Sequence, residues 1–196
     1  YIWQADDWPN WGYDLPALAP ALTGVSRAQG MLLGRLADVG LALRDQASLA
    51  ALTDDVVETS AIEGEVLNVE SVRSSVARRL GVDIGAVAPV DRHVEGVVEM
   101  VLDATSRSAE PLNAERLFGW HASLFPTGYS GMNRLTVGQW RDDAAGPMQV
   151  VSGQVGRRKV HFQAPPADVL PTETARFLAW ANAETGEPAL IKAGLA

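Results

Sequence analysis

The sequence predicts a mainly α-helical protein that carries one β-hairpin. Apolar residues recur at intervals of three and four along most of the chain, which is the period of a helix with one buried face. Between residues 130 and 166, short apolar runs separated by glycines indicate a β-hairpin instead. The 196-residue chain is 47% apolar and 20% charged, as is typical of a folded globular protein, so we expect a sizeable helical core.

The N-terminal part is expected to be an ordered arm followed by a long helix. Residues 1–14 are rich in aromatic side chains and turn formers, and we expect this arm to pack onto a helical surface. Asp14 is suited to cap the helix, and apolar residues at helical spacing then run along one face from Leu18 to Leu43. Gly30 and Gly34 interrupt that face, which favours a second helix packed closely against it.

Two shorter helices follow, and each has a recognisable end. The first ends near Glu63, because Gly64 can adopt the left-handed conformation that stops a helix. Asn68 is a good N-cap for the next helix, which Gly81 ends in the same way.

The C-terminal half is expected to hold the hairpin between further helices. Residues 91–107 form a helix despite their many valines, because those valines lie at helical spacing. Asn113 caps another helix, and the hairpin is expected at about 134–163. A helical pattern returns after Val169, and Pro188 opens a last helix.

Charge and composition exclude several classes of function. Twenty-four acidic and sixteen basic residues give a net charge of -8, which disfavours nucleic acid as a partner. A helical nucleic-acid-binding protein stays an alternative only because one helix carries three basic residues on its outer face, Arg73, Arg78 and Arg79. No run approaches the roughly 20 apolar residues of a membrane-spanning helix, so no membrane partner is expected. The chain has no cysteine and does not begin like a signal peptide, so we expect a cytoplasmic protein.

The sequence shows no self-contained active site. Its three histidines, His93, His121 and His161, are scattered, and none belongs to a metal-binding pair. His121 is expected to be a core histidine with a hydrogen bond to the backbone. No phosphate-binding loop or nucleophile elbow is present, so we assign no catalytic residue and no metal ligand.

One segment, residues 59–65, carries an unusual charge. Glu63 lies in the last turn of its helix, where the helix dipole disfavours a carboxylate by about 0.3–1 kcal/mol. Thr59 lies one turn earlier on the same face. The carboxylate is either a solvated acid at a helix end or a group placed to meet a cation.

This segment resembles a known regulatory motif. Thr59, Glu63 and Gly64 match [ST]-x-x-x-E-[GN], the inhibitory-helix motif of Fic-family protein AMP transferases that carry their inhibitor before the catalytic domain. Much of the remaining chain is also similar to such proteins, namely residues 1–4, 29–36, 60–68, 72–81, 138–141 and 160–166.

The resemblance implies a helical bundle of the Fic type with an N-terminal helical lobe and one β-hairpin flap. The lobe would span residues 1–85, and an incomplete Fic-like domain would span 86–196. The catalytic loop of the family, H-x-F-x-[DE]-G-N-G-R-x-x-R, would follow the helix that begins near Pro188, and the sequence reaches Ala196 without it. We therefore expect a portion of such an enzyme, inactive by itself. ATP and Mg²⁺ would serve the complete enzyme, and neither is expected to bind this chain tightly.

The resemblance also implies roles for two sets of residues. In the complete enzyme, which transfers AMP from ATP to a hydroxyl group of a target protein, Glu63 would pair with the loop arginine that otherwise holds the ATP γ-phosphate. Thr59, Ser60 and Gly64 complete this inhibitory segment. The flap would hold the target by strand addition, through Gln149, Val150, Val151, Ser152, Val160, His161 and Phe162.

Two further questions stay open at this point. A non-catalytic helical protein-interaction module is the alternative function, and the residues after position 196 would separate it from the enzyme. A homo-oligomer also stays open, since the tryptophan-rich arm can pack against its own core or a neighbouring copy. The sequence does not identify the target, the hydroxyl residue that is modified, or the direction of the physiological reaction.

Overall fold

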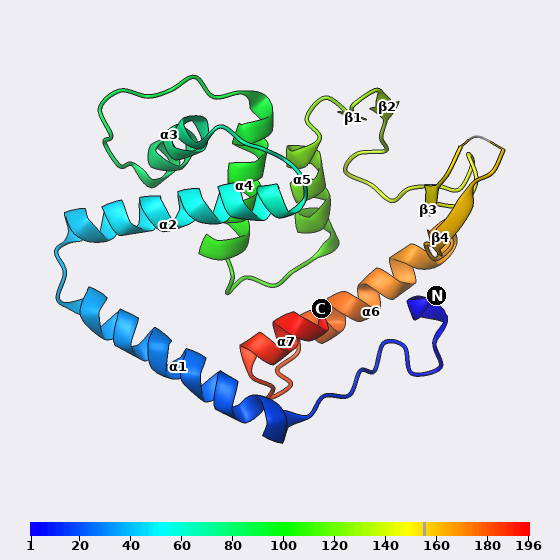
Figure 1. Cartoon of the computed structure of the whole chain (residues 1–196), viewed down its shortest axis with the longest axis horizontal. Coiled ribbons are helices and arrows are strands. Elements are labelled where there is room, and N and C mark those ends of the chain that lie inside the picture. The colour runs from blue at the N-terminus through cyan, green and yellow to red at the C-terminus, as the bar shows by residue number, and fades with distance from the viewer. Residues whose placement is uncertain (155) are drawn as a thin grey trace. The chain divides into compact units, whose positions relative to one another are not determined.

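The computed structural model describes residues 1–154 and 156–196, and this part of the chain is mainly helical (Figure 1). It contains seven α-helices and two small antiparallel hairpins, so the expected helical fold with a hairpin is confirmed. The chain divides into two compact units. The first comprises 1–22, 112–115 and 139–196, and the second comprises 23–111 and 116–138.

The first long helix is shorter than the sequence predicts. Asp14 caps it as expected, because its carboxylate accepts the Ala17 N–H at 3.1 Å. However, α1 (Leu15–Ala37) ends before Leu43, and α2 (Leu41–Ile62) begins after Gly40. Gly40 is the N-cap of α2 and has an extended ψ of 155°. Glycine is among the residues favoured at an N-cap, so Gly40 suits the start of a new helix.

The expected close packing at the glycines of α1 is also wrong. A Cβ added at Gly30 or Gly34 would meet nothing within 4 Å among the described residues. The helix buries none of its residues, and Leu32 and Leu33 are 58% and 67% exposed. The apolar pattern of α1 therefore marks a surface rather than a core.

The core of the second unit lies between α2, α3 (Val69–Leu80) and α4 (Arg92–Ser106), which pack together in Figure 1. Its buried apolar side chains are Leu49, Val56, Leu67, Val72, Val76, Ala77, Val94, Val97 and Val98. Both predicted ends of α3 are confirmed. The Asn68 side chain accepts the Ser71 N–H at 2.9 Å, and Gly81 has a φ of 71°.

The helix α5 (Ala114–Leu124) approaches α4 at a glycine. A Cβ built on Gly96 would lie 1.8 Å from the carbonyl oxygen of Ser123, so only glycine fits at this point of α4. The predicted helical reading of the valines in α4 is confirmed, and Asp91 caps this helix by accepting the Val94 N–H at 2.9 Å.

A carboxylate also links these two helices. Asp103 of α4 accepts the indole N–H of Trp120 at 2.7 Å and the Nε–H of Arg116 at 3.0 Å, both from α5. It also accepts an N–H of Arg107 at 2.8 Å. The hydrogen bond from Trp120, supported by the two guanidinium groups, holds the pKa of Asp103 below its usual value. Asp103 therefore stays ionised and ties α4 to α5.

The structure contains one hairpin more than the sequence predicts. In the second unit, β1 (Tyr129–Ser130) pairs with β2 (Asn133–Arg134). Gly131 begins the turn with a φ of 56°, a conformation that glycine adopts readily. The expected hairpin lies in the first unit.

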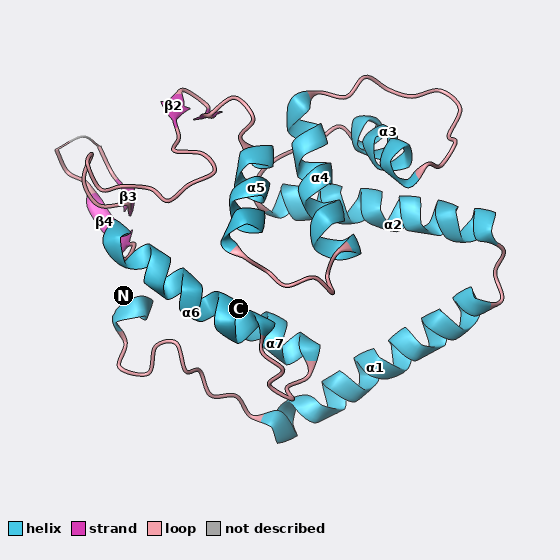
Figure 2. Ribbon diagram, turned by 180° about the vertical axis from the view of Figure 1, so that it is seen from behind, coloured by secondary structure: helices cyan, strands magenta, loops and turns pink. Residues whose placement is uncertain are grey.

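The predicted hairpin consists of β3 (Gln149–Ser152) and β4 (Lys159–Gln163), shown as strands in Figure 2. Residue 155, in the segment between these strands, lies outside the described residues.

The helices of the first unit are α6 (Leu170–Asn182) and α7 (Ala189–Leu195). Lys192 joins them, because its ammonium group lies 5.4 Å from the centre of the Trp180 ring and donates to the Ala183 carbonyl at 2.6 Å. Short 3₁₀ turns lie at Ile2–Gln4 and Ala167–Val169. Among the described residues, no helix combines the length and the apolar character needed to cross a bilayer.

Candidate functional site

The inhibitory-motif segment lies at the C-terminal end of α2. Glu63 is the residue that follows the last helical residue, and Gly64 has a φ of 82°. The Glu65 N–H donates to the Ser60 carbonyl at 2.9 Å, and the Gly64 N–H donates to the Ala61 carbonyl at 3.0 Å. This pattern is the usual end of a helix at glycine, so the predicted stop is confirmed.

The carboxylate of Glu63 faces solvent. The described residues provide no hydrogen bond and no salt bridge to it, and the residue is exposed. Thr59 is exposed as well, and its hydroxyl lies 3.5 Å from the Asp55 carboxylate rather than near Glu63. Ser60 is half-buried. The structure therefore places these residues on one turn and a half of helix without a direct contact between the side chains of Thr59 and Glu63.

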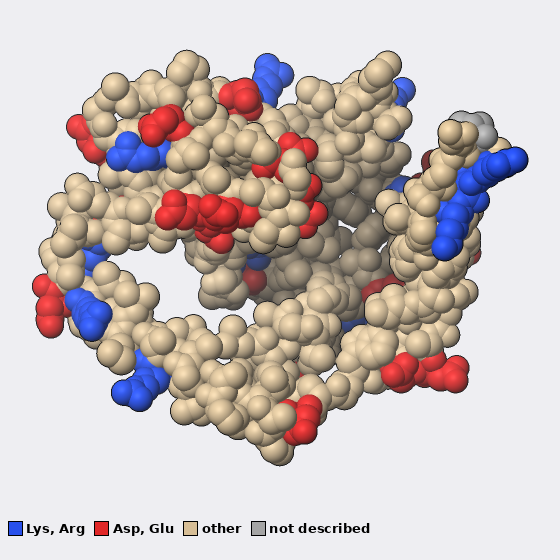
Figure 3. Space-filling model, viewed as in Figure 1, with Lys and Arg blue, Asp and Glu red and all other residues tan. Residues whose placement is uncertain are grey.

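The surface around Glu63 is acidic. Asp54, Asp55 and Glu58 lie on α2 and Glu65 follows it, and Figure 3 shows acidic side chains gathered over this helix. The negative end of the helix dipole adds to their field at Glu63. A guanidinium group suits such a position, because it can pair with a carboxylate through two parallel hydrogen bonds.

A histidine lies beside this segment, but no metal site does. Nε2 of His93 lies 3.9 Å from the Glu65 carboxylate, and the side chain of His93 is 44% exposed. Among residues 1–154 and 156–196, no group of three or more His, Cys, Asp or Glu side chains could hold a metal ion.

The β3–β4 hairpin brings together all seven residues predicted to dock a target. Val150 pairs with Phe162, Val151 with Val160, and Ser152 with Lys159. His161 is the extra residue of a bulge in β4, and its Nε2 lies 2.6 Å from the Ser152 hydroxyl. The whole of β3 is exposed, including Val150 at 58% and Val151 at 40%, so the apolar side chains of this strand are free to meet a partner.

An ion pair fixes the base of the hairpin. Arg141 pairs with Asp143 and also donates to the carbonyl of Pro165, beyond the end of β4. Asp143 in turn accepts the Ala167 N–H at 2.7 Å. The segment before β3 is therefore tied to the segment after β4, which holds the two strands in place.

The N-terminal arm packs onto this hairpin rather than onto a helix, so that expectation is corrected. The Trp3 indole N–H donates to the Gln163 carbonyl at 2.7 Å, and the ring of Tyr1 lies 5.6 Å from that of Phe162 in an edge-to-face arrangement. The end of β4 supplies both an aromatic ring and a free carbonyl, which explains why the aromatic arm binds there.

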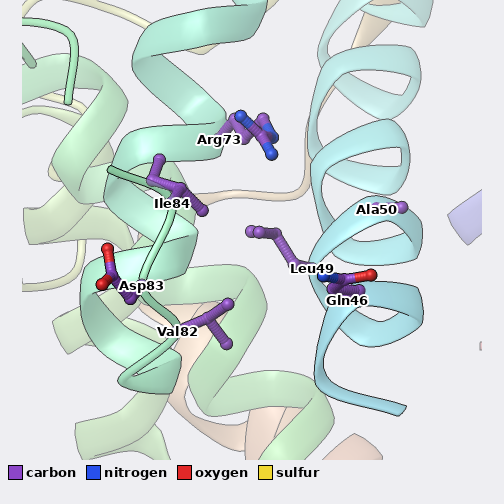
Figure 4. A pocket seen from close by; sticks show the side chains of 7 residues that line it. All are labelled: Gln46, Leu49, Ala50, Arg73, Val82, Asp83 and Ile84. Atoms are coloured by element: carbon purple, nitrogen blue, oxygen red, sulfur yellow. The ribbon is translucent and has the colours of Figure 1, made fainter. Parts of the chain in front are cut away.

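A cavity of about 440 Å³ lies in the second unit, and the sequence did not reveal it. Figure 4 shows its lining from α2, α3 and the segment after α3: Gln46, Leu49, Ala50, Arg73, Val82, Asp83 and Ile84. Its polar lining combines one cation, one carboxylate and one amide.

Three other predicted residues have structural partners. Arg78 and Arg79 both pair with Glu95 of α4, at 2.8 and 3.1 Å, which directs these guanidinium groups to a neighbouring helix. Nδ1 of His121 accepts the Gly138 N–H at 3.4 Å, so the expected backbone hydrogen bond is confirmed.

Comparison with known proteins covers less than half of the chain. Residues 1–82 match a family described as a domain of unknown function, DUF4172, and this span includes α1, α2 and α3. The description of that family names no activity. No curated protein matches the chain.

Proposed function

We propose that this chain is the regulatory and target-docking portion of an autoinhibited Fic-type protein AMP transferase. In this proposal, the catalytic loop lies after residue 196, and the complete enzyme, in the cytoplasm, transfers AMP from ATP to a hydroxyl side chain of a target protein. The resemblance of residues 59–64 to the inhibitory motif is the starting point, and the comparisons neither add to it nor oppose it.

The observation that carries the proposal is the position of Glu63. It is an exposed, unpaired carboxylate at the negative end of α2, beside a glycine that ends the helix. A helix end is a poor place for an acid without a partner, and a cation from the catalytic loop would remove that cost. The turn at Gly64 also leaves the side chain at a corner, where no further helical turn covers it.

Inhibition would follow from competition for one arginine. While Glu63 holds that guanidinium group, the γ-phosphate of the nucleotide lacks its cation and meets a negative charge instead. A hydrogen bond between charged groups contributes about 1.5–3 kcal/mol, which corresponds to a factor of about ten to one hundred and fifty in rate. Removing the carboxylate should release that restraint.

The test uses the protein extended through the residues that follow Ala196 in its gene. Incorporation of labelled AMP is measured for the unmodified protein, for Glu63→Gly and for the control Glu58→Gln. Glu58 is an exposed acid on the same helix, so its loss changes the local charge without removing the proposed inhibitor. The proposal expects at least tenfold faster AMP transfer only in Glu63→Gly. Equal rates in all three proteins would remove Glu63 from this role.

The hairpin would hold the target protein in the same proposal. Its exposed valines and its two-stranded form suit the addition of a third strand, in which backbone hydrogen bonds supply affinity and alternate side chains supply specificity. The anchoring of its base by Arg141 and Asp143 supports this use, because a fixed hairpin presents its edge in one orientation.

A non-catalytic interaction module is the second candidate, and α1 favours it. This helix buries no residue and exposes large apolar side chains, as a surface that binds another protein does. The gene sequence after Ala196 separates the candidates. A loop of the form H-x-F-x-[DE]-G-N-G-R supports the enzyme, and a continuation without it supports the interaction module.

A further inference from the structure

The end of the β3–β4 hairpin carries a cluster of positive charge in an acidic protein. Arg157, Arg158 and Lys159 are consecutive and exposed, although the chain as a whole has a net charge of -8. No described residue forms a salt bridge or a side-chain hydrogen bond with any of the three. Figure 3 shows basic side chains along this hairpin. We call these three residues the basic tip.

The two edges of the hairpin differ. The Ala164 N–H donates to the Met148 carbonyl, so these two residues form a hydrogen-bonded pair of the hairpin. Hydrogen-bonded and non-hydrogen-bonded pairs alternate along antiparallel strands, so the backbone N–H and C=O groups of the next pair, Gln149 and Gln163, point away from the hairpin. On the β4 side, the outward carbonyl of Gln163 is already bound by the indole of Trp3. On the β3 side, no hydrogen bond from the described residues reaches the outward backbone groups of Gln149.

The free edge leads directly to the basic tip. β3 runs from Gln149 to Ser152 toward the tip, and its two valines are exposed along the way. A strand laid antiparallel beside β3 would therefore begin at the tip and run away from it. Antiparallel pairing is somewhat more stable than parallel pairing, so this direction is favoured.

We propose that the partner of this hairpin is an extended acidic segment that adds to the outer edge of β3, with its acidic residues on the N-terminal side of the paired stretch, against the basic tip. This inference rests on the proposed docking function of the hairpin and adds the edge, the direction and the charge of the partner. The N-terminal arm keeps the β4 edge closed, so a single segment binds.

The test measures binding of short labelled peptides to the protein by fluorescence anisotropy. The first peptide has three glutamates followed by alternating valine and threonine, and the second has the same residues with the glutamates at the C-terminal end. A third has lysine in place of glutamate. Exposed ion pairs contribute a factor of about two to three each, so the first peptide should bind about tenfold more tightly than the other two. Raising the salt from about 50 mM to about 300 mM should remove most of that advantage, because it shortens the screening length.

Substitutions then assign the edge and the charge. Reversal of the tip by Arg157→Glu with Arg158→Glu should abolish the preference for the first peptide, whereas the control Arg92→Glu, an exposed base on α4, should preserve it. Gln149→Pro removes the outward N–H of β3 and should weaken all binding. Trp3→Ala opens the β4 edge and should leave the affinity unchanged.

Several results would overturn the inference. Equal binding of the first two peptides would contradict the antiparallel direction, and tighter binding in Trp3→Ala would place the partner on β4 instead. If a single-stranded DNA of equal charge bound as tightly as the first peptide, the basic tip would be a general anion site and strand addition would be refuted. These binding assays do not depend on AMP transfer. A negative result for inhibition by Glu63 therefore does not affect the inference about the hairpin, and a negative result in the binding assays does not affect the proposed inhibition.

Discussion

Replacement of Gly96 by alanine should destabilise the second unit, even though alanine is the better helix former. The added Cβ would lie 1.8 Å from the carbonyl oxygen of Ser123, where contacts below 3.0 Å are essentially never seen. Because the obstacle is backbone, α4 and α5 must separate by about 1.2 Å or more at this point. Inserting a methyl group into such a tight contact costs about 3 kcal/mol, and the gain in helix propensity offsets about 1 kcal/mol of it.

The expected net loss is therefore about 2 kcal/mol, which lowers the Tm by about 4–8 °C for a chain of this length. The matched control is Gly119→Ala in α5, where a Cβ would meet nothing within 4 Å. That variant should gain about 1 kcal/mol and raise the Tm by about 2–4 °C. Thermal unfolding followed by far-ultraviolet circular dichroism measures both. An unchanged or raised Tm in Gly96→Ala would refute the close contact between the helices.

Two further predictions concern a carboxylate and a helix cap. Asp103 has a pKa below its usual value in the folded protein, so its stabilising effect is present above the unfolded pKa and is lost as the pH falls through the folded value. When the pH is lowered from about 6 to about 2, the Tm of Asp103→Asn should therefore fall less than the Tm of the unmodified protein. Parallel curves of Tm against pH for the two proteins would contradict the assignment. Asn68→Ala removes the side chain that accepts the Ser71 N–H and should cost about 1 kcal/mol, measured by urea unfolding, and an unchanged midpoint would show that the cap adds nothing to α3.

The features that the sequence predicted correctly are local ones. Asn68 and Gly81 mark the ends of α3 because the residues themselves carry the capping group and the left-handed conformation. The helical reading of the valines in α4 succeeded for a similar reason, since the spacing of apolar residues reports the buried face directly. The exposed hairpin and the stop at Gly64 also follow from residues close together in the chain.

The features that the sequence missed depend on contacts between distant residues. Nothing in residues 1–14 shows that Trp3 will meet the carbonyl of Gln163, because the acceptor is a backbone group without a sequence signal. The close approach of Ser123 to Gly96 cannot be predicted from the sequence either, because the two residues lie on different helices that meet only in the folded chain. The break before α2 was missed for a different reason, since the apolar spacing continues through Gly40 and hides the change of helix.

The most direct measurement compares the affinities of ATP and ADP for the extended protein, with and without the carboxylate of Glu63. Titration calorimetry gives both dissociation constants. Only ATP carries the γ-phosphate, and Glu63 is proposed to occupy the arginine that binds this phosphate. We expect little preference for ATP in the unmodified protein and a preference about tenfold larger in Glu63→Gly. The same preference in both proteins would contradict the proposed restraint.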